Sequence, residues 1–273
     1  MDSASELVLE VRGLSKTYIQ GKWWQKKFHC RALDNVSLAL RPGTTLALVG
    51  ASGCGKTTLA MCIVGLENSD AGEIAVNGVR IGSLSKPAQR AARTEIQLVF
   101  QDSAGALNPR MSAIQIVEEP LLIRGQCGRG ERRELALKMM EQVGISANCM
   151  HRLPHEFSGG QRQRLAIARA LILKPRVLIL DEVFVGLDLS IQGQIGNLLL
   201  ELQQAAGLTY ICISHDLAIA GQIADTIALM EQGRIVESSP TKEFFKHPRH
   251  PLTIALAHAL QPNRSAMGAR SGV

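Results

Sequence analysis

Gly50-Ala-Ser-Gly-Cys-Gly-Lys-Thr57 directly follows the apolar run Thr45–Val49, and helix-forming residues continue from Thr57 to Val64. The octapeptide fits the pattern G-x-x-x-x-G-K-[ST] in the strand-to-helix context that this pattern requires. Its glycines let successive backbone N–H groups point at phosphate oxygens, and the start of the helix adds a partial positive charge. The stretch therefore predicts a P-loop fold and the binding of a nucleoside triphosphate.

Two side chains of this loop have distinct expected roles. Lys56 is expected to reach the β- and γ-phosphates, and the Thr57 hydroxyl is expected to ligate Mg²⁺. The other residues to which we assign contacts with the nucleotide are Gly50, Ala51, Ser52, Gly53, Cys54, Gly55 and Thr58.

A second apolar run, Val177–Leu180, ends in the acid pair Asp181-Glu182. Ligands of open α/β sheets bind at the carboxyl ends of the strands, so Asp181 is expected to hold Mg²⁺. Glu182 is placed to polarise the attacking water as a general base. An acidic strand end on its own is as often merely solvated as it is functional. Together with the phosphate loop, it indicates hydrolysis of the nucleotide.

Further apolar runs alternate with helical stretches, except in the middle of the chain. The other expected strands are Leu7–Val11, Val36–Leu40, Glu73–Val76, Val79–Ile81, Ile96–Phe100, Thr209–Ile213 and Ile227–Met230, and Ser190–Ala205 is an expected helix. From 113 to 173 no strand pattern occurs, and Leu135, Met139 and Val143 recur at the spacing of an amphipathic helix. This organisation predicts an α/β core with a parallel sheet and an inserted helical subdomain at about residues 102–173.

The composition excludes some classes of protein without choosing a partner. The 273 residues include 30 Lys+Arg and 24 Asp+Glu, and the net charge of +6 would suit phosphate ligands, polyanions or an acidic membrane surface. No run approaches the roughly 18 apolar residues of a membrane span, and the N-terminus lacks the apolar segment of a secretory signal. The six cysteines form no C-x-x-C pair, which predicts reduced thiols.

Phe157-Ser-Gly-Gly-Gln161, followed by Arg-Gln-Arg and a helical pattern, resembles the signature motif of the ATP-binding-cassette ATPases. Three more motifs are similar to that family and occur in its order. Gln101 resembles its glutamine loop, Gly186-Leu-Asp188 its D-loop, and Ser214-His215-Asp216 its switch histidine. The resemblance covers roughly 7–262.

The resemblance implies a P-loop NTPase core with an N-terminal antiparallel β subdomain and the inserted helical subdomain. Residues 1–262 would form a single nucleotide-binding domain, in which 240–262 are a C-terminal extension. Residues 263–273 would be a flexible tail.

The same resemblance implies ATP and Mg²⁺ as the ligands and gives roles to further residues. Gln101 would be a magnesium ligand and catalytic, His215 would contact the γ-phosphate, and Tyr18 would stack on adenine. Aromatic packing inside the β subdomain is the alternative for Tyr18. Two cassettes would close head to tail around two ATP molecules, and the residues given to this shared site are Ser158, Gly159, Gly160, Gln161 and Asp188.

Several longer phrases look like the oligopeptide, dipeptide and nickel importer branch of the family. They are Val99–Arg110, Pro154–Arg164 and His250–Leu256. This likeness implies an ATP-hydrolysing subunit that energises uptake of peptide, nickel or a similar small solute. Its partners would be a second ABC ATPase subunit, two membrane permease subunits and an extracytoplasmic solute-binding protein, with the chain peripheral on the cytoplasmic face of the membrane. Gln101–Arg110 would press on a permease.

Two alternatives belong to other classes. A soluble cassette ATPase acting on nucleic acid or ribosomes would fit the basic pI, but such proteins usually carry two cassettes or long coiled-coil inserts, so no nucleic-acid partner is expected. A P-loop kinase or GTPase would leave the signature unexplained, and the chain has no Asn-Lys-x-Asp motif.

Three details depart from the family pattern or lie outside it. Val183-Phe-Val-Gly186 stands where most of the family has Pro-Thr-Ser-Ala. No cysteine follows Cys212, so no iron–sulfur cluster is expected. Trp23-Trp24, among lysines, is interpreted as a surface loop on the β subdomain rather than a lipid anchor.

Overall fold

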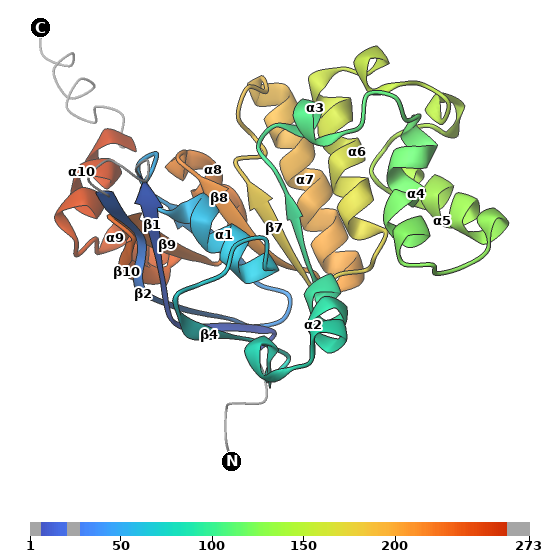
Figure 1. The fold of residues 1–273 in the computed structure, drawn as a ribbon. Coiled ribbons are helices and arrows are strands. Elements are labelled where there is room, and N and C mark those ends of the chain that lie inside the picture. The colour runs from blue at the N-terminus through green and yellow to red at the C-terminus, as the bar shows by residue number, and fades with distance from the viewer. Residues whose placement is uncertain (1–6, 21–27, 261–273) are drawn as a thin grey trace, which may run out of the picture.

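The computed structural model describes residues 7–20 and 28–260 (Figure 1). The Trp23-Trp24 insert and the predicted tail at 263–273 lie outside these ranges. The strands form a six-stranded sheet in the order β10-β9-β3-β8-β7-β6 and a four-stranded sheet in the order β2-β1-β4-β5. The predicted combination of a parallel sheet, an antiparallel sheet and helices is confirmed.

Five strands of the larger sheet are parallel, and β10 is antiparallel to β9. Every residue of β3, β7 and β8 is buried, because helices and the second sheet cover both faces. Such strands are near-continuous apolar runs, and for this reason the bounds predicted from the sequence agree closely with those of the structure. The strands are β3 (Thr45–Val49), β6 (Ile96–Val99), β7 (Val177–Asp181), β8 (Thr209–Ser214), β9 (Thr226–Glu231) and β10 (Arg234–Pro240).

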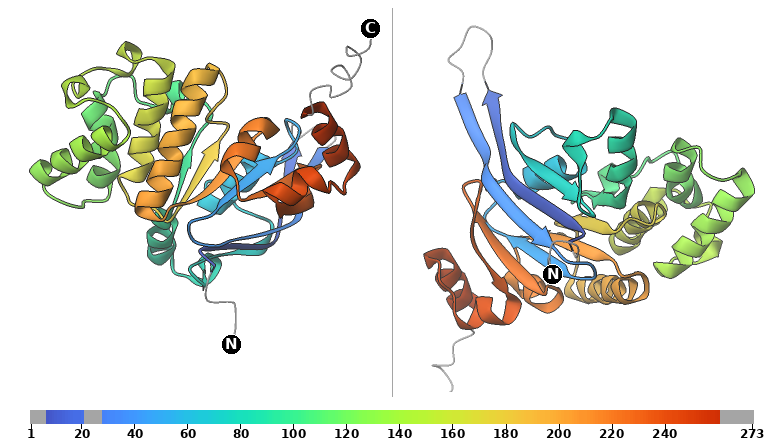
Figure 2. Two further views of the ribbon diagram at one scale, coloured as in Figure 1. Left: turned by 180° about the vertical axis from the view of Figure 1, so that it is seen from behind. Right: turned by 90° about the horizontal axis from the view of Figure 1, so that it is seen from below.

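The antiparallel sheet is larger than the sequence predicts. Strand β1 covers Leu9–Gln20 and β2 covers Phe28–Leu40, and they pair as one long ribbon (Figure 2). Register shifts between Val11 and Thr17 interrupt the alternation of apolar and polar residues. The sequence pattern therefore did not predict the C-terminal half of β1 or the N-terminal half of β2. The remaining strands are β4 (Ala71–Val76) and β5 (Val79–Arg80).

The predicted turn between β4 and β5 is confirmed. Asn77 and Gly78 have φ angles of 49° and 77°. Positive φ at both central residues is the requirement of a type I′ hairpin.

The helices fall into three groups along the chain. Helices α1 (Lys56–Val64), α7 (Leu189–Ala206) and α8 (Leu217–Ile223) pack on the sheets, and α2 (Lys86–Ala92) has no buried residue. The helical insert has α3 (Ser103–Ala106), α4 (Ala113–Ile123), α5 (Arg129–Gln142) and α6 (Gly159–Leu171), and the C-terminal segment has α9 (Thr241–Lys246) and α10 (Pro251–Leu260). Within the described ranges, none of these helices has the length and apolar character that crossing a bilayer would require.

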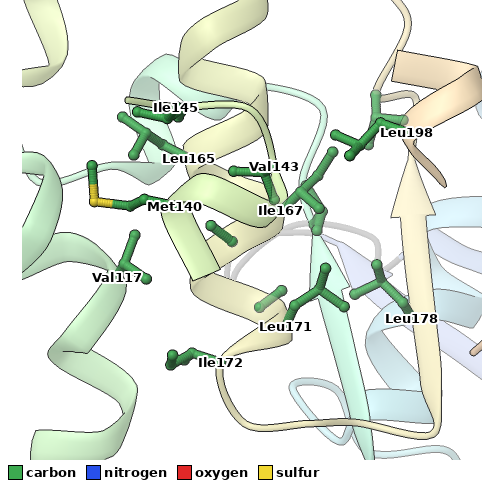
Figure 3. Packing of buried hydrophobic residues seen from close by; sticks show 14 of the residues in the cluster. Val117, Met140, Val143, Ile145, Leu165, Ile167, Leu171, Ile172, Leu178 and Leu198 are labelled. Carbon is green, nitrogen blue, oxygen red and sulfur yellow. The ribbon is translucent and has the colours of Figure 1, made fainter. Parts of the chain in front are cut away.

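The helical insert shares its core with the sheet. Figure 3 shows Met140 and Val143 packed with Ile167 of α6, and the same cluster continues to Leu178 of β7. The expected stripe on α5 needs a correction: Val143 is buried, but Leu135 and Met139 are only partly buried. The helix turns Ala136 and Met140 inward instead, because the packing partners lie on both α4 and α6.

Glu237 of β10 anchors the C-terminal segment. Its carboxylate accepts the backbone N–H of His250 at 2.8 Å, the N–H of Arg249 at 3.1 Å and the hydroxyl of Thr253. Burial raises the pKa of Glu237, but these hydrogen bonds outweigh burial and hold the pKa below its ordinary value. The carboxylate therefore fixes the start of α10 against the sheet.

Replacement Glu237→Gln is expected to lower the free energy of unfolding at neutral pH by about 1–2 kcal/mol, because a charged acceptor is lost. A carboxyl group whose folded pKa is depressed stabilises the fold above its unfolded pKa, and this contribution is lost as the pH falls through the folded pKa. Urea titrations at neutral pH and at about pH 3 measure the effect. The exposed Glu243→Gln serves as control, and a deficit of Glu237→Gln that persists unchanged in acid would contradict the assignment.

Candidate functional site

The predicted site residues follow four adjacent parallel strands. The phosphate loop follows β3, His215 follows β8, Glu182 follows β7 and Gln101 follows β6. The register places Val49 opposite Ser214, which brings the ends of the two central strands level. The fold thus gathers these predicted residues at one edge of the sheet.

The phosphate loop is packed too tightly for side chains at two of its glycines. A Cβ at Gly50 would lie 2.2 Å from the carbonyl oxygen of Met230, and a Cβ at Gly55 would lie 2.3 Å from that of Ala32. Gly55 also has a φ of 113°, in the region that favours glycine. Glycine is therefore required at both positions by contact with neighbouring strands.

Lys56 and the start of α1 supply positive charge inside the loop. Lys56 is only 5% exposed, and its Nζ donates to the carbonyl oxygens of Gly50 at 2.8 Å and Ala51 at 2.9 Å. Among the described residues no side chain caps α1, and its first turn holds no acidic residue. The first N–H groups of this helix are therefore suited to an anion.

Asp181 has the character of a cation ligand. It is 3% exposed, and its Oδ1 has no hydrogen-bond partner among the described residues. Burial, with the charge of Glu182, raises the pKa of Asp181, against the opposing effects of a hydrogen bond with Thr57 and the charge of Lys56. An unpaired buried carboxylate oxygen beside a threonine hydroxyl fits Mg²⁺, which prefers oxygen ligands.

Glu182 and His215 lie side by side at the same edge. Glu182 Oε1 is 3.7 Å from His215 Nδ1, and the Glu182 N–H donates to the carbonyl oxygen of Ile213 at 3.0 Å. Glu182 has a φ of 50°, an unusual conformation for a non-glycine residue that is often found at functional sites. The His215 side chain is 54% exposed and Glu182 only 16%, so the imidazole faces outward beside a more buried carboxylate. The pair can hold a water molecule and contact an anion.

Two groups of predicted residues lie on elements other than these four strand ends. Tyr18 lies on β1, paired with Cys30 of β2, and the Nζ of Lys16 is 5.2 Å from its ring centroid. Ser158 and Gln161 start α6 and cap it reciprocally, with bonds of 3.0 Å and 3.3 Å. This helix start belongs to the helical insert, away from α1 (Figure 1).

The start of α6 instead packs against the segment that follows Glu182. A Cβ at Gly160 would lie 2.6 Å from Ile191, and one at Gly159 would lie 3.7 Å from Leu187. The Asp188 carboxylate accepts the N–H of Ile191 at 2.9 Å and so caps α7. The D-loop and the signature of one chain are therefore in direct contact.

The unusual Val183–Gly186 segment has a packing explanation. Val183 and Phe184 are buried in the core that the helical insert shares with the sheet. The side-chain amide of Gln192 donates to the carbonyl oxygens of Phe184 and Leu187, both at 3.1 Å. Gly186, with a φ of 75°, makes the turn.

The sequence did not predict that α10 lines the cavity beside the phosphate loop. A cavity of about 530 Å³ borders the phosphate loop, and its lining includes Gly50–Cys54, His215 and, from α10, Leu252 and Leu256. The motif at His250–Leu256 was visible in the sequence, but nothing local indicates that it packs beside a loop about 200 residues earlier. Gln232-Gly233, between two apolar runs, was the available signal for the β9–β10 turn.

Comparison with known proteins agrees with these features. Residues 33–185 match the family model described as ABC transporter. The chain is 48% identical to the dipeptide transport ATP-binding protein DppF of Escherichia coli strain K12, over 84% of this chain and 69% of that protein. It is 44% identical to the oligopeptide transport ATP-binding protein OppF of the same strain, over 87% and 72%. A dimeric, post-hydrolysis structure of the ATP-binding cassette MJ0796 bound to ADP and Pi superposes with a TM-score of 0.75 and 29% identity, over 85% of this chain and 98% of that one.

Alkylation of Cys54 is expected to abolish nucleotide binding, and bound ATP is expected to protect the thiol. Cys54 is buried inside the loop with its Sγ 3.8 Å from Lys56 Nζ, so an added group would occupy the phosphate position. Titration with a fluorescent ATP analogue measures the loss. Cys30 and Cys127 are exposed and also react, so Cys54→Ala is the control that should keep binding after treatment. Undiminished affinity with Cys54 fully modified would contradict the placement.

Proposed function

Because this chain belongs to the ABC transporter family and is an ATP hydrolase, we propose that it is the energy-supplying subunit of an importer for peptides or similar small solutes. The observation that carries the ATP-driven part is the single sheet edge that holds the phosphate loop, Asp181, Glu182 and His215. The names of DppF and OppF, transport proteins for dipeptides and oligopeptides, support the solute class. Nickel stays a prediction of the sequence.

The polar groups around Lys56 define how the triphosphate would be held. Lys56 exchanges its bonds to the carbonyls of Gly50 and Ala51 for bonds to phosphate oxygens. Thr57 and Asp181, with Gln101 from the neighbouring strand end, would hold Mg²⁺, which would supply electrostatic stabilisation of the phosphate charge. Asp181 is suited to this role because one of its buried oxygens has no donor within the part of the chain that the structure describes.

Glu182 and His215 then act on the terminal phosphate. The Glu182 carboxylate orients the attacking water and accepts its proton. His215, within 3.7 Å of that carboxylate, donates to the phosphate oxygens from the strand end of the same chain. Placement of both groups directly after buried strands provides the alignment that phosphoryl transfer needs.

A second ATPase subunit would complete each site. Ser158, Gly159 and Gly160 lie at a helix start within the helical insert, where backbone N–H groups suit an anion brought by another chain. The dimer of the MJ0796 cassette offers a precedent for two cassettes together. The remaining partners would be two permeases, which contact Gln101–Arg110, and a solute-binding protein. The chain would then lie peripherally on the cytoplasmic face of the membrane.

Glu182→Gln is expected to keep ATP affinity close to that of the wild type while lowering turnover at least about a hundredfold, because the base that accepts the proton is lost. ATP binding and phosphate release by the purified protein measure the two quantities separately. Glu73→Gln, on the exposed surface of β4, is the matched control. Wild-type hydrolysis by Glu182→Gln would show that another group is the base.

Affinity purification of the tagged chain from membranes of its own cell is expected to recover two permeases and an ATPase subunit, and transport assays of this complex should show ATP-dependent peptide uptake. Lys56→Ala should assemble equally well but lose uptake, because only phosphate binding is removed. Recovery of the chain with ribosomes or nucleic acid instead of permeases would overturn the importer proposal.

A further inference from the structure

Asp34 of β2 is a buried carboxylate held by two arginines. It is 8% exposed. Its Oδ1 pairs with Arg31 of the same strand, and its Oδ2 accepts both Nε and Nη2 of Arg234, the first residue of β10. Because β2 belongs to the antiparallel sheet and β10 to the larger sheet, the Asp34–Arg234 pair joins the two sheets.

Backbone hydrogen bonds connect this pair to the phosphate loop. The Asp34 N–H donates to the carbonyl oxygen of Gly233 at 2.9 Å, and the Gly233 N–H donates to that of Cys54 at 2.9 Å. Gly233 lies in the β9–β10 turn and directly precedes Arg234. The turn is thus bonded on one side to Asp34 and on the other to the loop that holds phosphate.

Close contacts leave the loop little freedom to shift relative to this turn. The Ala32 carbonyl, two residues before Asp34, lies against both Gly55 and Gly233, where added Cβ atoms would be 2.3 Å and 2.9 Å away. Met230, just before the turn, lies against Gly50 in the same way. A displacement of the turn would therefore displace the loop.

Stability alone is a poor explanation of the Asp34–Arg234 pair. Removing the Asp34 carboxylate from water has a cost, and its attraction to an arginine that stays in contact with water is weak, so the pair is weak evidence for stabilisation. The planar arginine fork, by contrast, fixes the relative orientation of the two groups that it joins. Arg234 is 66% exposed, so its order depends on Asp34 rather than on burial.

We propose that Asp34, acting through Arg234, is a positioning residue for ATP: it fixes the β9–β10 turn and thereby the phosphate loop. Asp34 itself does not touch the nucleotide. The proposal rests on ATP binding at this loop and not on the identity of the imported solute.

Asp34→Asn is expected to raise the Kd for ATP about tenfold, because a neutral amide orients Arg234 less firmly. At saturating ATP the kcat should change less than about twofold, since the acid pair on β7 is untouched. The Arg234→Lys variant keeps the charge but loses the planar guanidinium, and it should raise the Kd for ATP by a smaller factor. Titration of the purified chain with a fluorescent ATP analogue gives Kd, and steady-state hydrolysis by the complex recovered from membranes gives KM and kcat.

The Glu73–Arg80 pair lies in the same antiparallel sheet but is exposed on both sides, so Glu73→Gln should leave Kd unchanged. In the double variant Asp34→Asn/Arg234→Lys, the Kd should exceed that of Asp34→Asn alone by less than about twofold, because both changes break one interaction.

A folded Asp34→Asn with wild-type Kd, or one with lowered kcat and unchanged Kd, would overturn the proposal. If Asp34→Asn does not fold, wild-type Kd in Arg234→Lys overturns it. Failure of peptide uptake with normal ATP binding would instead affect only the importer proposal.

Discussion

The phosphate loop lies in contact with two carbonyl groups that come from different sheets. Gly50 touches the Met230 carbonyl of β9, and Gly55 touches the Ala32 carbonyl of β2. The N–H groups that a loop exposes to a ligand cannot also hold its shape by hydrogen bonds within the loop, so contacts from outside are needed besides the bonds of Lys56 to Gly50 and Ala51. Both sheets are consequently needed for one loop, which explains why the antiparallel sheet is packed where it is.

The chemistry of the site depends on how deeply the central strands are buried. Strands β7 and β8 are buried throughout and deliver Asp181 and Ser214 at one edge. The same burial raises the pKa of Asp181, and its Oδ1 has no donor in residues 7–20 and 28–260. This arrangement disfavours the isolated anion and favours a bound cation. The buried Asp181 carboxylate lowers the stability of the fold, and a bound cation would restore it.

Local patterns in the sequence were sufficient for the central strands and for the motifs of the site. Buried parallel strands such as β3 are continuous apolar runs, and the phosphate loop is contiguous in the chain. The outer half of β1 was missed because register shifts break its alternation. Strand β10 was missed because its residues are mostly exposed or half-buried. The pairing of Asp34 with Arg234 spans 200 residues, and no local signal could predict it.

In the proposed pair of ATPase subunits, the start of α6 and the segment after Glu182 would serve different nucleotides, and within one chain these two places are in contact. Gly160 lies against Ile191, and Gln192 ties the intervening segment to the carbonyls of Phe184 and Leu187. Movement beside Glu182 would therefore be passed to the helix start that the proposed pair assigns to the opposite site. Two sites connected in this way are not expected to hydrolyse ATP independently. A pair with one inactivated site should therefore hydrolyse ATP at a rate different from half that of the wild type.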